Sequence, residues 1–386
     1  MLTSGIQFKN FKKNKKINYF KIRKKFSALL NEKNYVLDSL KKNYKDNFSK
    51  KLINKYKKYS TFKVIGMGGS SLGTQTIYEF LKDNVKKDFV FIDNLRQKKL
   101  KIKNKKSVNL VVSKSGNTIE TVVNSNIYIK QDDANIFITE NKDNYLLKLA
   151  NNLKAEIIHH NNYIGGRYSV LSEVGMLPAE LMGLNPNKFR QLNLLIKNKK
   201  FINNLMSGVS STLNYIKNKK YNSIILNYDE KSENLFKWYQ QLVAESLGKK
   251  SKGLLPIVSN MPKDNHSVMQ LYLDGFKNNF YTFFYFNENN SSKIINKNVL
   301  HSKRYLKNKK LSDIIFAQKK ATENIFNKKN IPFRSFEIFK RDEKTLGELF
   351  CFFILETILL GKVMNINPYN QPAVELIKNE TEKILS

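Results

Sequence analysis

Short apolar runs alternate with longer amphipathic stretches in the first half of the chain, which is the pattern of β-strands joined by α-helices. The strand-like runs cover residues 62–67, 88–93, 108–113, 134–140 and 155–159, and amphipathic stretches such as 73–85 and 118–130 lie between them. Because strands joined through a helix pair in parallel, this alternation predicts a doubly wound parallel sheet.

A second alternating set follows a helical stretch at 192–218. Its strands are expected at 221–228, 254–258, 280–286 and 332–338, and its helices at 234–247, 264–275 and 345–360. A Pro/Asn-rich elbow at 365–372 and a last helix follow. We therefore predict an α/β protein with two doubly wound parallel-sheet domains, at 45–185 and 190–362, between a helical N-terminal arm at 1–44 and a C-terminal arm at 363–386.

Two turns rich in Gly, Ser and Thr stand where expected strands end and expected helices begin. The first reads GMGGSSLGT at 66–74 and the second SKSGNT at 113–118. In a parallel sheet such turns meet at the carboxyl edge, where backbone N–H groups, hydroxyls and helix N-termini hold anions. The nucleotide-binding patterns G-x-G-x-x-G and G-x-x-x-x-G-K-[ST] do not fit the first turn. The pair of turns indicates a cradle for a phosphorylated sugar, and ordinary loop chemistry is the alternative for each turn.

A carboxylate and an amide lie four residues apart on the helix expected at 234–247. Glu245 and Gln241 therefore share a helix face. The apolar neighbours Leu242 and Val243 would withdraw Glu245 partly from water, which suits a general base. The alternative is a solvated carboxylate that pairs with Lys249.

Arg167 and His266 are further candidates for chemistry. Arg167 follows two glycines in GGRYS at 165–169, where a guanidinium can hold a phosphate or a developing oxyanion. His266 lies in a polar turn before an expected helix, which presents it rather than burying it. The alternatives are a surface arginine and a structural histidine. With one cysteine and no two histidines spaced i, i+4, we predict no metal site.

The charge balance is extreme, with 68 Lys and Arg against 32 Asp and Glu and a net charge of +36. Such a charge suggests nucleic acid or an anionic membrane as partner. The lysines, however, are spread along the whole chain among asparagines, and no RNA-recognition, zinc or helix-turn-helix pattern accompanies them. We attribute the excess to biased coding composition, and expect no specific nucleic acid and no membrane partner.

The cysteine content and the apolar runs indicate in which cellular compartment the protein is expected. Cys351 is the only cysteine, which excludes an internal disulfide and fits a reducing, cytoplasmic location. The first ten residues contain no apolar stretch of signal-peptide length. The most apolar run, 346–360, includes Glu348 and Glu356, so we interpret it as a buried helix rather than a membrane span.

Six stretches of the chain, in this order, together resemble the glucose-6-phosphate isomerase family. They are IGMGGSSLG at 65–73, VVSKSGNTIET at 111–121, GGRYSVLSEVGMLP at 165–178, WYQQLVAESLGK at 238–249, DNHS at 264–267 and NPYNQPAVELIK at 367–378. The resemblance implies two sugar-isomerase (SIS) domains and interconversion of glucose 6-phosphate and fructose 6-phosphate through a cis-enediol(ate), in glycolysis and gluconeogenesis. It also implies a homodimer with a shared active site, and the chemistry requires no cofactor.

The resemblance also assigns roles to individual residues. Glu245 matches the base, Arg167 the group that steadies the enediolate, and His266 and Lys378 the groups that open the sugar ring; nothing in the local sequence marks Lys378 by itself. The histidine is implied to act in the partner subunit's site. The remaining matches hold the substrate: Gly69, Ser70, Ser113, Lys114, Ser115 and Thr118 at the phosphate, and the amides Gln241 and Gln371 along the sugar.

Three readings compete with this assignment. One is a related sugar-phosphate isomerase that also accepts mannose 6-phosphate. Another is a non-catalytic sugar-phosphate-binding protein built on the same domains, and the joint presence of Glu245, His266, Arg167 and Lys378 argues against it, because a sensor has no need of a base. The third is a nucleic-acid binder, which is favoured by the charge alone.

Overall fold

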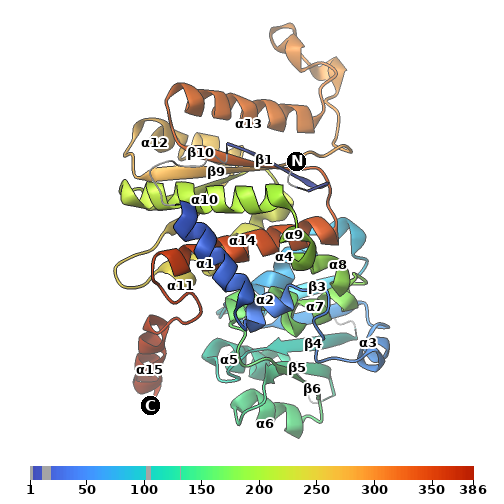
Figure 1. Ribbon diagram of the computed structural model, residues 1–386. Helices are drawn as coiled ribbons and strands as arrows, with labels where there is room; N and C mark the ends of the chain where they lie inside the picture. The colour runs from blue at the N-terminus through green and yellow to red at the C-terminus, as the bar shows by residue number, and fades with distance from the viewer. Residues whose placement is uncertain (1–2, 11–18, 101–105, 131) are drawn as a thin grey trace.

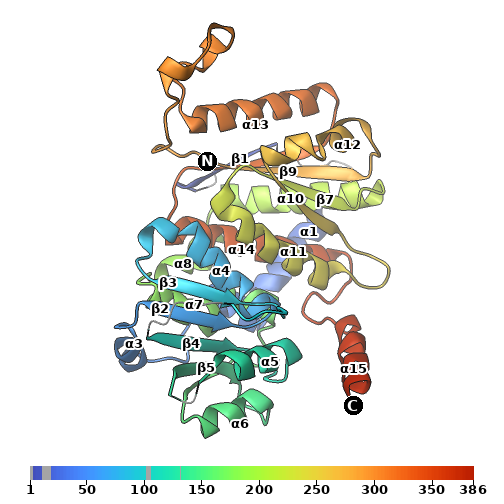
Figure 2. The ribbon, with the colours of Figure 1, turned by 180° about the vertical axis from the view of Figure 1, so that it is seen from behind.

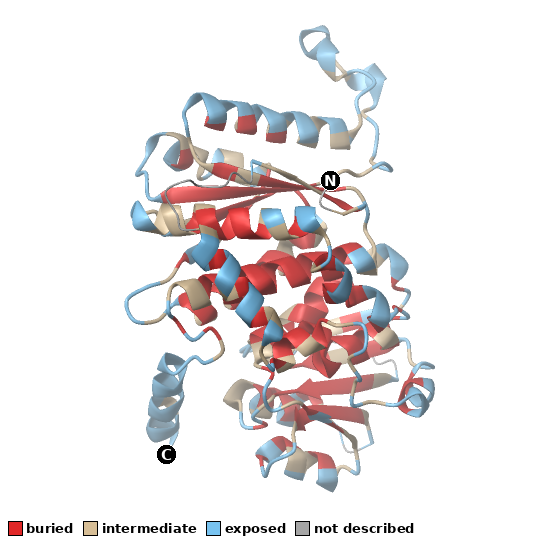
Figure 3. Cartoon of the chain, in the orientation of Figure 1, coloured by how far each residue is buried: buried red, intermediate tan, exposed pale blue. Residues whose placement is uncertain are grey.

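The computed structural model describes residues 3–10, 19–100, 106–130 and 132–386, so residues 11–18 of the expected N-terminal arm lie outside the described part. Two five-stranded sheets lie at opposite ends of the molecule, with a layer of helices between them (Figure 1). The buried residues concentrate in this helical layer and in the strands on either side of it (Figure 3).

The first sheet has the order β3-β2-β4-β5-β6 and is parallel throughout. Helices α4 (Leu72–Phe80), α5 (Ile119–Tyr128) and α6 (Tyr145–Asn152) follow strands of this sheet. This confirms the parallel α/β prediction for the first half of the chain. The strands are β2 (Thr61–Ile65), β3 (Asp88–Ile92), β4 (Ser107–Val112), β5 (Ala134–Glu140) and β6 (Glu156–His160).

The second sheet has the order β1-β10-β9-β7-β8, and its four later strands are parallel. Helices α11 (Glu233–Leu247), α12 (Met269–Asp274) and α13 (Leu311–Lys328) connect them. The predicted strands of the second half are confirmed to within two residues at their ends. They are β7 (Asn222–Asn227), β8 (Leu255–Asn260), β9 (Asn279–Phe286) and β10 (Phe333–Ile338).

The fifth strand of this sheet corrects the expectation of a wholly helical N-terminal arm. Strand β1 (Ile6–Lys9) pairs antiparallel with β10, and Ile6 lies opposite Ile338. The ring of Phe8 packs 4.4 Å from that of Phe336, centroid to centroid. Four residues are too few to show a periodicity of their own, and it is this packing on the sheet edge that makes the segment a strand. Helices α1 (Tyr19–Asn31) and α2 (Tyr35–Ser39) follow.

The helical layer is built around α14 (Glu343–Val363), whose residues from Thr345 to Gly361 are all buried. It packs against α1, α8 (Pro186–Phe189), α10 (Lys199–Lys217) and α11, and α11 also packs against α4 of the first half. The apolar run at 346–360 is therefore a core helix, as expected. None of the helices in the described part of the chain is long and apolar enough to cross a membrane.

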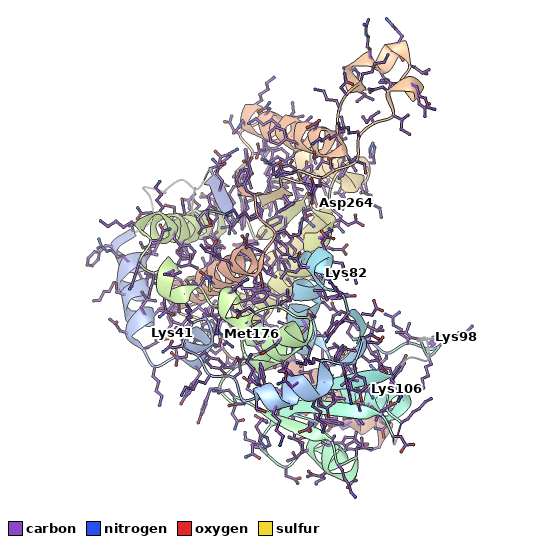
Figure 4. The ribbon with its side chains drawn as sticks, turned by 90° about the vertical axis from the view of Figure 1, so that its right-hand side faces the viewer. Lys41, Lys82, Lys98, Lys106, Met176 and Asp264 are labelled. Atoms are coloured by element: carbon purple, nitrogen blue, oxygen red, sulfur yellow. The ribbon has the colours of Figure 1, made fainter. Side chains whose placement is uncertain are left out.

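Two segments project from this body. Helix α15 (Ala373–Leu385) has no buried residue and extends away from the helical layer (Figures 1 and 2). Residues 287–310, between β9 and α13, project at the opposite end (Figure 2). Basic side chains occur on several parts of the molecule: in Figure 4, Lys41 lies well apart from Lys82, and both lie apart from Lys98 and Lys106.

Candidate active site

The two Gly/Ser/Thr turns lie side by side at the carboxyl edge of the first sheet, as predicted. Strands β2 and β4 are parallel neighbours, with Ile65 opposite Val111. A Cβ on Gly66 would lie 2.8 Å from the carbonyl oxygen of Val112, so the turns begin in contact. The first turn continues as the 3-10 helix η1 (Gly68–Ser70) into α4, and the second leads into α5.

The second turn presents two hydroxyls next to a helix N-terminus. Ser113 is buried, and its Oγ lies 3.0 Å from Oγ1 of Thr118, the residue before α5. Gly116 has φ +66°, and a Cβ there would lie 1.8 Å from Oδ1 of Asn144. The glycine therefore fixes the turn in a form that other residues cannot adopt, and the turn holds the hydroxyl pair in place.

The other residues expected at the phosphate differ in exposure. Ser70 is half-buried in η1, and Ser115 is exposed. Lys114 donates from Nζ to the carbonyl oxygen of Asn162 at 2.6 Å. Burial lowers the pKa of Lys114, and the charge of Arg167 contributes to the same shift. Lys114 thus joins the second turn to the loop that leads to Arg167.

Two glycines of the first turn allow it to meet the rest of the site. Gly69 packs on the segment that carries Arg167, the 3-10 helix η3 (Gly166–Leu171), where a Cβ would lie 2.1 Å from the carbonyl carbon of Gly166. Gly68 has φ +52°, and a Cβ there would lie 2.8 Å from Nε2 of Gln241 on α11. The first turn, η3 and α11 therefore converge, and a larger residue at Gly69 would push them apart.

Arg167 is the centre of this convergence, because its guanidinium is buried and every nitrogen of it donates. The side chain is 1% exposed. Nε donates to Ser246 Oγ at 2.8 Å; Nη1 donates to Glu245 Oε2 at 3.0 Å and to Gln371 Oε1 at 2.8 Å; Nη2 donates to the carbonyl oxygens of Pro368 at 2.7 Å and Asn370 at 3.2 Å.

Glu245 lies between Arg167 and an open cavity. Its side chain is 28% exposed, and its Oε1 accepts from Gln241 Nε2 at 2.8 Å. The cavity has a volume of about 850 Å³ and is bounded by the end of α11 and by residues 366–374. The alternative pairing of Glu245 with Lys249 is not what the structure shows, since Lys249 donates to backbone carbonyls instead. Oε1 of Gln241 is buried without a hydrogen-bond partner, which leaves an acceptor for a ligand hydroxyl.

A buried histidine supports the turn that carries Arg167. His160 Nδ1 lies 2.8 Å from Glu173 Oε1, and Nε2 lies 3.0 Å from the carbonyl oxygen of Ile164. The ring thus lies between a buried carboxylate and a backbone carbonyl oxygen. Burial alone would raise the pKa of Glu173, but the bonds from His160 and the Asn161 backbone together lower it. Sequence reasoning missed this role for His160.

The two residues expected to open the sugar ring are exposed and are not hydrogen-bonded to Arg167 or Glu245. His266 is exposed in the 3-10 helix η5 (Lys263–His266) after β8, and neighbouring Asp264 lies at the margin of the molecule in Figure 4. Lys378 is exposed on α15 and pairs with Glu375 at 2.7 Å. In the part of the chain that the structure describes, no three His, Cys, Asp or Glu side chains gather as a metal site would require.

The family model and the curated relatives point to the same family. The family model described as "Phosphoglucose isomerase" matches residues 22–386. The chain is 34% identical over 355 residues to the "Glucose-6-phosphate isomerase" of Methanocaldococcus jannaschii, with 84% of each protein covered. It is 30% identical over 345 residues to that of Campylobacter jejuni, again with 84% of each covered.

Solved structures agree with the fold. A hypothetical protein from Thermus thermophilus superimposes with a TM-score of 0.80 at 22% identity, covering 95% of this chain and 94% of that one. A glucose-6-phosphate isomerase from Chlamydia trachomatis gives a TM-score of 0.76 at 16% identity, covering 99% and 89%.

Proposed function

Since the chain belongs to the phosphoglucose isomerase family, we propose that the cavity beside Glu245 is where glucose 6-phosphate and fructose 6-phosphate are interconverted. The activity is an intramolecular aldose–ketose isomerisation, a step of glycolysis. The observation that carries the assignment of the site is a carboxylate, partly exposed to a cavity, whose other side is held by a buried guanidinium.

This pair supplies what the proton transfer requires. Glu245 takes the proton from C2 of the open-chain aldose and returns it to C1, and the reverse reaction runs the other way. When the proton leaves carbon, negative charge appears on the adjacent oxygen. Arg167 lies 3.0 Å from Glu245, so a cation already fixed in place stabilises that charge.

The rest of the substrate is assigned to the elements around this pair. Hydroxyl groups and helix N-termini in the two turns hold the phosphate, and the amides hold the sugar. The unpartnered Oε1 of Gln241 supports the second assignment. The phosphate residues are Gly69, Ser70, Ser113, Lys114, Ser115 and Thr118, and the amides are Gln241 and Gln371.

Ring opening is assigned to His266 and Lys378, with His266 acting in the site of a second subunit. His266 is exposed and is not among the residues that bind Arg167 in its own subunit, which supports this homodimer. Exposed apolar side chains on α15 support it too, because such a surface is normally covered. They are Leu376, Ile377, Ile384 and Leu385, which are 69–77% exposed.

We propose two further properties on separate grounds. The division into domains at 45–185 and 190–362 is kept, with Ile6–Lys9 added to the second because it pairs with β10. A cytoplasmic location is proposed because the only cysteine, Cys351, is fully buried and forms no disulfide.

The base is tested with purified protein, by following the conversion of fructose 6-phosphate to glucose 6-phosphate through a coupled dehydrogenase. Glu245→Gln cannot accept the proton, so kcat falls on the order of a hundredfold or more. The matched control is Glu233→Gln at the start of the same helix, where Glu233 pairs with Lys237 on the surface, and its activity stays within about twofold of wild type. Retention of more than about a tenth of the activity by Glu245→Gln contradicts the assignment.

The shared site is tested by mixing subunits. Dimers of His266→Ala alone and of Glu245→Gln alone have two damaged sites each. After joint unfolding and refolding, roughly half of the dimers are mixed, and each mixed dimer has one site free of both changes, so activity returns to at most about a quarter of wild type. If gel filtration shows a dimer and subunits exchange, yet no activity returns, His266 does not act across the interface.

A further inference from the structure

Lys249 stands beside the catalytic carboxylate and has no role in the mechanism above. It follows the end of α11, four residues after Glu245, and lines the same cavity. Its ammonium donates to the carbonyl oxygen of Ser246 at 3.1 Å and to that of Asn367 at 2.6 Å. One side chain therefore ties the end of the helix that carries Glu245 to the elbow at 365–372.

The elbow is held from several sides. Lys249 donates to the carbonyl of Asn367, and Arg167 donates to those of Pro368 and Asn370 and to the side chain of Gln371.

Two uncharged groups also bind the elbow. The hydroxyl of Tyr168 donates to the Pro368 carbonyl at 3.0 Å, and Asn34 Nδ2 donates to the hydroxyl of Tyr369 at 2.6 Å. Lys249 differs from these contacts because it joins the elbow directly to the end of the helix that carries Glu245.

An ordinary helix cap accounts for only part of this arrangement. A lysine after a helix commonly donates to the last carbonyls, as Lys249 does to Ser246. The shorter bond, however, crosses to a segment more than a hundred residues away, with a separation of 118 in sequence. Burial lowers the pKa of Lys249 to about 8, and the charge of Arg167 adds to that shift. A cation kept in a partly buried place near another cation costs free energy that a plain cap does not require.

We propose that Lys249 is a positioning residue for the isomerisation. It holds the elbow against the end of α11, so that Arg167 and Gln371 keep their positions relative to Glu245. This rests on the proposed function of the Glu245 site. Lys249 does not exchange a proton with the sugar. Its effect is on the geometry in which Arg167 meets the developing charge, so its loss lowers the rate of the chemical step rather than the binding of the phosphate, which is assigned to the two turns after β2 and β4.

The test compares Lys249→Met with Lys237→Met in the full-length enzyme. Both remove one positive charge, and Lys237 is exposed on the surface of α11 and does not line the cavity. For Lys249→Met we expect kcat to fall about ten- to a hundredfold, the scale of a misplaced catalytic group, while KM for fructose 6-phosphate changes less than about threefold. Lys237→Met stays within about twofold in both constants. Lys249→Arg keeps a cation that can donate to both carbonyls, and recovers part of the loss in kcat.

Thermal melting of each variant separates positioning from unfolding. If Lys249→Met does not fold, Lys249→Gln, which keeps an amide donor and lacks the charge, replaces it. Equal kcat values for Lys249→Met and Lys237→Met overturn the inference, as does a loss that appears only in KM. If wild-type protein shows no isomerisation, the proposed function fails first; if wild type is active and Lys249→Met behaves like its control, only the inference about Lys249 fails.

Discussion

Replacing Arg167 with lysine is the sharpest probe of the site, because it keeps the positive charge and removes the planar fork. The guanidinium donates five hydrogen bonds, and an ammonium has three donors. At least two acceptors therefore lose their bond to Arg167. Ser246 Oγ and the Pro368 carbonyl still face the hydroxyl of Tyr168, and Asn370 and Gln371 are exposed. The cost is therefore that of about one partly buried group left unsatisfied, roughly 1–3 kcal/mol, which is still a sizeable share of the stability of an ordinary protein.

The same substitution also affects catalysis. The lysine ammonium is a point charge on a flexible chain, and cannot bind Glu245, Gln371 and the elbow carbonyls at once. The charge that faces the developing enediolate is therefore no longer held in one position. We expect kcat to fall on the order of a hundredfold, the usual cost of losing a preorganised oxyanion donor.

Arg190→Lys is the matched control. Arg190 is also buried, and it donates to Asp46 at 2.6 Å and to the carbonyl oxygen of Leu171 at 3.1 Å, but no atom of it contacts Glu245. Urea unfolding gives the change in stability and the coupled assay gives kcat. Both variants lose stability, and only Arg167→Lys loses turnover among molecules that remain folded. If the folded Arg167→Lys enzyme keeps more than about a third of kcat, the guanidinium is a structural clamp and the catalytic role assigned to it is wrong.

Three further expectations follow from the geometry. The double substitution Ser113→Ala and Thr118→Ala raises KM for fructose 6-phosphate more than it lowers kcat, because the phosphate does not react; steady-state kinetics with the reverse pattern would exclude these hydroxyls. Glu173→Gln removes one half of the buried pair with His160 and destabilises the fold by about 3–5 kcal/mol at neutral pH. The folded-state pKa of Glu173 is lowered from 4.5, so its contribution is present above that value and is lost as the pH falls through the lower pKa; urea titrations should show the difference from wild type shrinking in acid. Incubation with EDTA leaves turnover unchanged, since proton transfer by a carboxylate beside a cation needs no metal.

The regular elements could be predicted because their signal is local. The strand expected at 134–140 is found at Ala134–Glu140, and its interior is fully buried, as its apolar pattern requires. Parallel pairing could be predicted from the helices between the strands. Parallel pairing in turn places the two Gly/Ser/Thr turns at the same edge of the sheet. Strand β1 could not be predicted in this way, because Ile6–Lys9 becomes a strand only by pairing with residues more than three hundred positions away.

The candidate site could be predicted only in part, for the same reason: local contacts leave a pattern in the sequence and long-range contacts do not. Glu245 and Gln241 could be paired from their spacing, and the structure joins them at 2.8 Å. The hydrogen bonds that hold Arg167 could not be predicted, because two of the acceptors are backbone carbonyls that lie 201 and 203 residues away from Arg167 in the sequence. Every residue has a carbonyl, so no residue type marks the ones that bind.

The same fact limits what side-chain substitution can reveal about the elbow. Replacing Asn370 with alanine leaves its carbonyl in place, and the bond to Arg167 can still form. Apart from the side chain of Gln371, the elbow contributes to the site through the path of its backbone, which depends on the groups that hold it. The substitutions that report on this path are therefore those of residues that bind the elbow from outside, such as Arg167, Lys249 and Tyr168.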